Sequence, residues 1–168
     1  VTTTTTYTYT LISTGGSCPD TATGTITVNP DDEISLTSAN SSQIVCEGDT
    51  ITPITYALSG GATGVTITGL PNGVTHTVNA GIVTISGTPT ENITGSFDSF
   101  GFNVVTTGNC NPKTRTGTIR INSDHSMFAD PGLTTQEICE GDSIDPIDFT
   151  VSNGATSAIL VGAPDGIV

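Results

Sequence analysis

Apolar and β-branched residues alternate with polar ones along most of the chain, in short runs that end at Gly, Pro or Asn. Tyr7, Tyr9 and Leu11 occupy every second position of the first run, which is the period-two pattern of a β-strand. Residues 15–17, Gly-Gly-Ser, provide a turn, and a second alternating run follows at 23–28. The N-terminal part of the chain is therefore predicted to be a β-hairpin.

Similar short runs continue through the rest of the sequence, each bounded by turn-forming residues. No segment carries the apolar periodicity of an amphipathic helix. Strands of this length and spacing are typical of an all-β sandwich. The predicted strands cover 34–36, 43–45, 51–58, 65–68, 74–78, 82–85, 100–105 and 116–121.

The chain repeats itself with a period of 93 residues. Cys-Glu-Gly-Asp at 46–49 returns at 139–142. Gly-Thr-Ile at 24–26 returns at 117–119. One fixed period is the signature of a tandem array, whose modules contact mainly their neighbours and form an extended rod. We expect the C-terminal strands of one module in residues 1–30, a complete module in 31–122, and the N-terminal part of a third module in 123–168.

The formal net charge of −13 bears on the possible partners. A strongly acidic surface repels phosphate groups, so nucleic-acid binding is not expected. No apolar run approaches the roughly eighteen residues of a membrane span, so membrane insertion is not expected either. This composition suits solubility outside the cell.

The four cysteines recur once per half-repeat and none lies in a C-x-x-C pair. This pattern favours a disulfide framework in an oxidising compartment over a zinc or redox motif. We favour a bond between Cys46 and Cys110, which closes a loop within the complete module and leaves Cys18 and Cys139 to partners outside the sequence. The pairs Cys18–Cys46 and Cys110–Cys139 also respect the repeat, and would instead join successive modules.

Two segments resemble a known family. Gly-Leu-Pro-Asn-Gly-Val at 69–74 and Gly-Ile-Val-Thr-Ile-Ser-Gly-Thr-Pro-Thr at 81–90 resemble the putative-Ig family of bacterial surface repeats. The tetrapeptide at 46–49 and Gly-Asn-Cys at 108–110 resemble Ig-like and PKD-like repeats of large Bacteroidota surface proteins, among them the gliding-motility adhesins. The resemblance implies tandem Ig-like β-sandwich modules in an extended rod, export by the type IX route, and an extracellular location.

Three sites resemble the Bacteroidota O-glycosylation motif, in which Asp precedes Ser or Thr and then a small or apolar residue. The acceptors would be Thr21, Thr50 and Ser143, and the last two occupy the same place in successive repeats. A purely structural interpretation stays open, because Asp49 and Asp142 are also suited to forming the turn before a strand.

Acidic residues gather at both predicted boundaries between modules. Calcium is bound by several oxygen ligands that meet at one point, and clustered carboxylates could supply them. The acidic residues therefore suggest calcium as a metal, and no other cofactor is expected. The alternative is an acidic linker exposed to solvent. The sequence contains no EF-hand loop, which favours this alternative. The weak calcium candidates are Asp31, Asp32 and Glu33 at the first boundary and Asp124 and Asp130 at the second.

No arrangement of residues predicts catalysis. His76 and His125 lie far apart in sequence, and neither is near a nucleophile motif. We therefore expect a non-enzymatic, structural repeat segment of a long extracellular filament or cell-surface adhesin stalk, whose partners are neighbouring repeats and other copies in a fibre. The alternatives are an adhesive module that binds glycans or surfaces with the help of calcium, and polymerisation by exchange of the strand in residues 1–14.

Overall fold

The computed structural model describes residues 1–129, 134–153 and 155–162, and all regular structure in these ranges is β. The all-β prediction is confirmed. No helix capable of crossing a membrane occurs within these ranges. The strands are β1 (Thr5–Ile12), β2 (Thr21–Val28), β3 (Asp32–Leu36), β4 (Ser42–Cys46), β5 (Ile54–Gly60), β6 (Ala62–Thr68), β7 (Val74–Asn79), β8 (Ile82–Gly87), β9 (Phe97–Gly108), β10 (Thr114–Asn122), β11 (Ser126–Ala129) and β12 (Phe149–Ser152).

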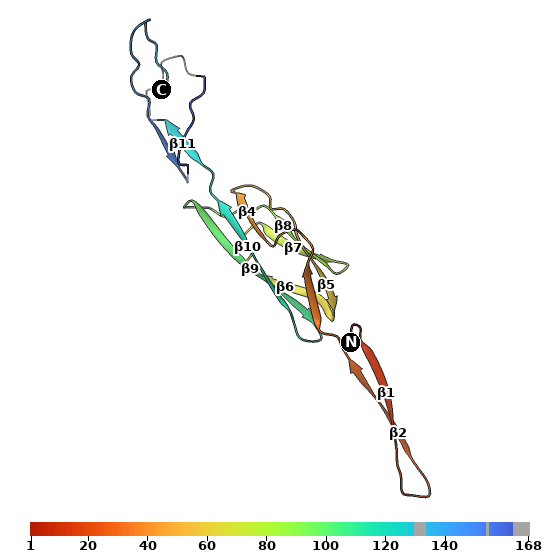
Figure 1. The fold of residues 1–168 in the computed structure, drawn as a ribbon. Coiled ribbons are helices and arrows are strands. Elements are labelled where there is room, and N and C mark those ends of the chain that lie inside the picture. The colour runs from red at the N-terminus through yellow and green to blue at the C-terminus, as the bar shows by residue number, and fades with distance from the viewer. Residues whose placement is uncertain (130–133, 154, 163–168) are drawn as a thin grey trace.

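Two four-stranded sheets form a sandwich in the middle of the chain (Figure 1). One has the order β3-β5-β8-β7 and the other the order β4-β10-β9-β6. We letter the strands A to G in chain order from β3 to β10, leaving β4 out. One sheet then has the order A, B, E, D of an immunoglobulin domain, and β6, β9 and β10 of the other sheet are its C, F and G strands. The additional strand β4 pairs in parallel with β10, whereas the other neighbours are antiparallel. The central part of the chain is therefore an Ig-like β-sandwich.

The core of this sandwich is built from inward-facing residues of both sheets. On β9 the buried residues Phe102 and Val104 alternate with exposed or half-buried ones, and Ile119 and Ile121 do the same on β10. Complete burial of such side chains contributes roughly 2 kcal/mol each. Every residue of the buried apolar cluster lies between positions 34 and 121, so the core belongs to this segment alone: Ile34, Ile51, Ile54, Tyr56, Val74, Val83, Ile85, Ile93, Phe102, Val104, Ile119 and Ile121.

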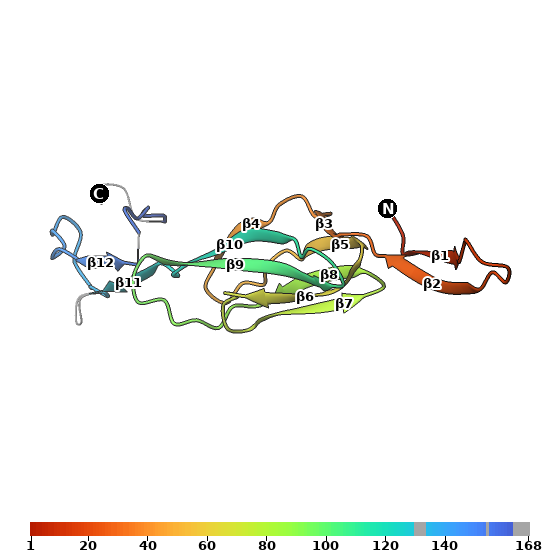
Figure 2. The same ribbon diagram turned by 90° about the horizontal axis from the view of Figure 1, so that it is seen from below.

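Two smaller sheets lie beyond opposite ends of the sandwich (Figures 1 and 2). The hairpin β1–β2 extends from the end where the FG turn, between β9 and β10, is found. The pair β11–β12 lies beyond the other end.

The β1–β2 hairpin reproduces the β9–β10 hairpin residue for residue. Tyr9 faces Gly24 in the first hairpin, and Phe102 faces Gly117 in the second, so that both partners are shifted by 93 positions. In both hairpins the aromatic ring occupies the space that a Cβ on the facing glycine would need. The sequence repeat is therefore also a repeat of strand register and of side-chain packing.

The segment after the sandwich repeats its first strands in the same way. Ser126 pairs with Ser152 as Glu33 pairs with Ser59. A side-chain brace recurs as well. The Gln43 amide exchanges hydrogen bonds of 2.6 and 2.9 Å with the backbone of Thr52, and the Gln136 amide exchanges two of 2.8 Å with the backbone of Asp145.

Candidate functional site at the joints

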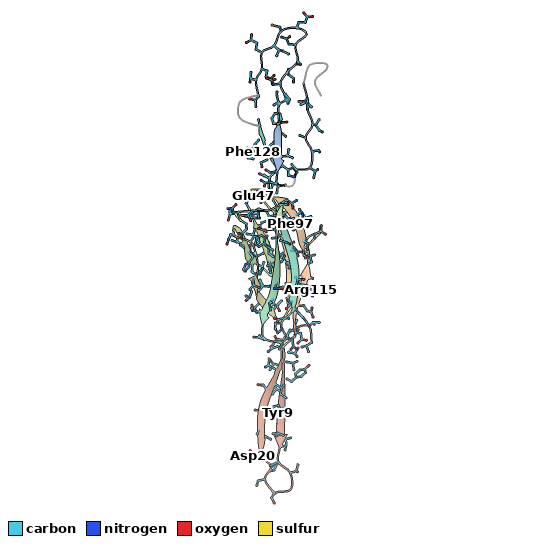
Figure 3. All side chains as sticks on the ribbon, turned by 90° about the vertical axis from the view of Figure 1, so that its left-hand side faces the viewer. Tyr9, Asp20, Glu47, Phe97, Arg115 and Phe128 are labelled. Atoms are coloured by element: carbon cyan, nitrogen blue, oxygen red, sulfur yellow. The ribbon has the colours of Figure 1, made fainter. Side chains whose placement is uncertain are left out.

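Two chain segments at the ends of the sandwich are candidates for function, because the repeat predicts that neighbouring units meet there. We call residues 29–32 the first joint and residues 122–125 the second joint; they are equivalent by the 93-residue shift. Figure 3 shows Glu47 and Phe97 at the end of the sandwich that is nearer to Phe128. It shows Tyr9 and Asp20 on the hairpin beyond the opposite end.

At the first joint the FG turn is fastened to the chain that enters the sandwich. The Asp32 amide donates a hydrogen bond of 3.2 Å to the Cys110 carbonyl. The Asn111 side-chain amide donates one of 2.7 Å to Asp31 Oδ1. The half-buried Cys110 thiol donates to the Asn29 carbonyl oxygen at 3.9 Å. The turn and the joint are thus held together by three contacts.

At the second joint the chain leaving the sandwich lies beside β4. Asn122 is the register partner of Cys46, and the Glu47 amide donates a hydrogen bond of 2.9 Å to the Asn122 carbonyl. The Cys46 side chain is exposed and borders a surface hollow. The hollow is completed by Asn122, Ser123, Asp124 and His125.

The predicted Cys46–Cys110 disulfide is wrong, since the structure places these residues at opposite ends of the sandwich. Cys46 is in register with Asn122, and Asn122 with Phe97 at the start of β9. Cys110 lies beyond the other end of β9, about 40 Å away at roughly 3.3 Å per residue. A disulfide requires Cα atoms within about 7 Å. All four cysteines are free, including Cys18 and Cys139.

The calcium candidates of the first joint do not converge. Asp32 is fully buried and Glu33, on the opposite face of β3, is exposed. In the described ranges no group of three or more His, Cys, Asp or Glu side chains is arranged to hold a metal ion. Asp124 is exposed at the second joint, and Asp130 lies outside the described residues.

The burial of Asp32 is unusual because neither carboxylate oxygen has a hydrogen-bond partner in the described part of the chain. The carboxylate packs against the backbone of Gly61 and Gly108. A buried carboxylate without a partner reduces stability. The sequence pattern predicts that an acidic residue at a boundary between units is exposed to solvent, so it did not indicate that Asp32 is buried.

The three O-glycosylation candidates lie on the surface. Thr21, Thr50 and Ser143 are all exposed. Thr50 Oγ1 shares a hydrogen bond of 2.7 Å with Thr88 Oγ1. The Asp49 amide donates to the Cys46 carbonyl at 3.1 Å, which supports a turn-forming role for this segment. The modification itself stays a prediction.

An exposed patch on the β4-β10-β9-β6 sheet was not predicted from the sequence. The Arg120 guanidinium lies 3.6 Å from the centroid of the Phe97 ring, and its Nε donates to Asn122 Oδ1 at 3.0 Å. Ile44 is 65% exposed beside them. At the shift of 93 residues, Phe97 and Arg120 correspond to Thr4 and Thr27, so the patch does not recur in the first hairpin.

Three further side chains carry groups that could take part in chemistry: two histidines and a tyrosine. His76 lies exposed on β7, and His125 is exposed at the second joint. The Tyr56 hydroxyl is buried in the core, and this burial raises the pKa of Tyr56 above its ordinary value of 10.0. Phe149 is the equivalent of Tyr56 in the next repeat, so the position requires an aromatic ring rather than a phenol.

The solved structures that match this chain do so at low sequence identity. No protein-family model matches the sequence. No curated protein matches it. A chimeric titin Z1Z2 carrying a KLER peptide from decorin is similar at 18% identity and a TM-score of 0.44, covering 58% of this chain and 100% of that chain. Titin M4 is similar at 14% identity and a TM-score of 0.44, covering 56% and 99% respectively.

Human CDH23 EC21-23 is similar at 16% identity and a TM-score of 0.40, covering 78% of this chain and 48% of that chain. The assignment of an Ig-like sandwich rests on the strand order described above. None of these three structures is a Bacteroidota adhesin, so the resemblance to gliding-motility adhesins is unsupported by the comparisons.

Proposed function

We propose that this chain is a segment of a tandem array of Ig-like units that forms a long extracellular filament or cell-surface adhesin stalk. The observation that carries the proposal is the repeated register. Strands β1 and β2 pair as β9 and β10 do, and β11 and β12 pair as β3 and β5 do, all at a shift of 93 residues. Flanking segments that reproduce parts of one fold at one period are what an array requires.

The exposed face of the first hairpin supports the same proposal. Leu11 and Ile26 are 63% and 57% exposed, whereas their equivalents Val104 and Ile119 are fully buried. A contiguous exposed apolar face marks an interaction site. The remaining strands of an Ig-like unit are the natural cover, because in the central sandwich they cover this same face.

The proposed role is mechanical and non-catalytic. Each unit adds length, and its partners are the neighbouring repeats and other copies in a fibre. The net charge of −13 keeps such a rod hydrated and soluble. Glycans on Thr21, Thr50 and Ser143 would add to this. Export by the type IX route and a gliding-motility-adhesin origin belong to the proposal through the motif resemblance alone.

The second candidate function is an adhesive module, which the Phe97–Arg120 patch favours. An exposed aromatic ring beside a guanidinium offers both stacking and hydrogen bonding to a polar ligand such as a glycan. Its absence from the first hairpin is typical of a binding site confined to some units. Glycan-array binding that is lost in both Phe97→Ala and Arg120→Ala would support this candidate over the purely structural role.

Gold labelling with an antibody against residues 31–122, viewed by electron microscopy on intact cells and on shed surface material, tests the proposal. Label at regular intervals along thin external fibres is expected. Label confined to fibre tips or non-fibrous patches would favour the adhesive module, and label found only inside cells would contradict both functions.

A further inference from the structure

We propose that a disulfide bond crosses each joint of the array, between the Cys110 position of one unit and the Cys46 position of the unit before it. This inference rests on the proposed tandem array. It differs from every pairing that the sequence suggested, because it joins cysteines in adjoining units that neither the favoured nor the alternative pairing brought together.

The first half of the argument is the location of Cys110. Its thiol lies 3.9 Å from the carbonyl oxygen of Asn29, the residue directly after strand β2 of the preceding hairpin. The contact is held from both sides, because Asp32 and Asn111 fasten the FG turn to the joint. Cys110 therefore points at the end of the previous unit rather than into its own core.

The second half is the location of Cys46 at the opposite end. It is the parallel register partner of Asn122, and Glu47 continues this pairing. Its side chain is exposed beside Ser123 and Asp124 of the second joint. Cys46 therefore lies where the FG turn of a following unit would arrive.

The repeat brings these two observations to one place. Asn29 and Asn122 are equivalent by the 93-residue shift, and the hairpins that lead to them pair in the same register. In the preceding unit the residue equivalent to Cys46 is then the strand neighbour of Asn29. Paired strands lie about 4.8 Å apart, and disulfide-bonded residues have Cα atoms about 4.4–6.8 Å apart. The Cys110 thiol, in contact with Asn29, is within reach of that cysteine.

Bond formation follows ordinary thiol–disulfide exchange. The thiolate of one cysteine attacks an oxidised dithiol carrier or glutathione disulfide, and the second thiolate then displaces the carrier thiol. One S–S bond forms, two thiol protons are released, and the carrier accepts two electrons. The bond would tie the FG turn of each unit to β4 of its predecessor and so restrict bending at the joint.

The test uses a polypeptide in which residues 30–122, one full period, are followed directly by a second copy. The buried core lies entirely inside this segment, and the fusion recreates the Asn-Pro-Asp joint found at 29–31. After oxidation in a glutathione redox buffer, non-reducing peptide mass spectrometry should show Cys46 of the first copy linked to Cys110 of the second. The other two cysteines should stay free and react with a maleimide.

Matched variants locate the bond. Cys110→Ser in the second copy should abolish the link, whereas Cys110→Ser in the first copy should leave it intact. A tandem with two cooperatively folded copies and four reactive thiols, or with a link inside one copy, would overturn the disulfide and leave the array standing. If X-ray scattering instead shows the copies side by side rather than end to end, both the array and the disulfide are overturned. If the tandem of residues 30–122 fails to fold, it would be replaced by residues 1–122 followed by residues 30–122. The same bond, from Cys46 of the first part to Cys110 of the second, is expected there.

Discussion

The ring of Phe102 occupies the space that a Cβ on Gly117 would need, across the pair β9–β10. Phe102 is 1% exposed and enclosed by the core, and the backbone oxygen of Ser41 lies against the same Cβ position, so neither neighbour can move away. Gly117→Ala should therefore destabilise the sandwich by about 1–3 kcal/mol, the usual cost of overpacking. Urea denaturation of the 168-residue chain measures this loss.

Two matched variants separate this effect from a general cost of removing glycine. Gly101 lies on the neighbouring strand β9 and has open space where its Cβ would be, so Gly101→Ala should change stability by less than about 0.5 kcal/mol. Gly24 faces Tyr9, whose ring is exposed and free to turn away, so Gly24→Ala should cost equally little. Equal losses in all three variants would refute the packing argument.

Ile119 and Ile26 are equivalent in the repeat but differ in burial, at 0% and 57% exposure. Ile119→Ala should cost about 2–5 kcal/mol in unfolding free energy, and Ile26→Ala within about 0.5 kcal/mol. The two hairpins become equivalent when the remaining strands of a unit precede the first one, for example when residues 30–93 are placed directly before residue 1. In that polypeptide Ile26→Ala should cost about 2–5 kcal/mol, as Ile119→Ala does. A cost that stays within about 0.5 kcal/mol would contradict the equivalence of the two hairpins.

Tyr56 should make the sandwich sensitive to alkaline pH. Burial raises its pKa in the folded state above 10.0, so the stabilising contribution is fully present below about pH 10 and is lost as the pH rises through the folded-state value. Tyr56→Phe, which copies Phe149, should keep the neutral-pH stability within about 1 kcal/mol and flatten this alkaline decline. Urea denaturation between about pH 8 and pH 11 measures this decline. If the decline is the same in Tyr56→Phe, the titration of another group causes it.

Asp32 should reduce the stability of the sandwich, because it is fully buried and its carboxylate oxygens have no hydrogen-bond partner in the described residues. Asp32→Asn keeps the shape and replaces a carboxylate with an amide, which is less costly to bury. An increase of about 1 kcal/mol or more in unfolding free energy is expected from chemical denaturation. A decrease of that size would mean that the carboxylate has a partner, such as a bound cation.

Much of the fold could be predicted because local patterning and the repeat agree. The alternation around Tyr7 and Tyr9 gave the hairpin β1–β2, and the predicted run 23–28 lies within β2. The predicted strand at 51–58 begins only at Ile54, after Pro53, because proline cannot donate a hydrogen bond to a neighbouring strand. The other predicted strands likewise differ at their ends, whereas β11 and β12 have no counterpart among the strands predicted from the alternation.

The cysteine pairing could not be predicted in the same way, since it depends on which ends of the strands meet. In an immunoglobulin domain the inter-sheet bond joins strands B and F, which are β5 and β9 here. Cys46 instead ends the extra strand β4, and Cys110 lies past the end of β9. Because β4 runs parallel to β10 and therefore antiparallel to β9, the two cysteines are at opposite ends. No local pattern reveals that parallel pairing.

The most direct test of the tandem account is the length of the molecule as copies are added. Polypeptides with two, three and four successive copies of residues 30–122 should be compared by small-angle X-ray scattering. An array of end-to-end units predicts that the maximum dimension grows by a constant step, about 40 Å per copy from the length of β9. A dimension that grows only as the cube root of mass, as for a compact particle, would contradict it.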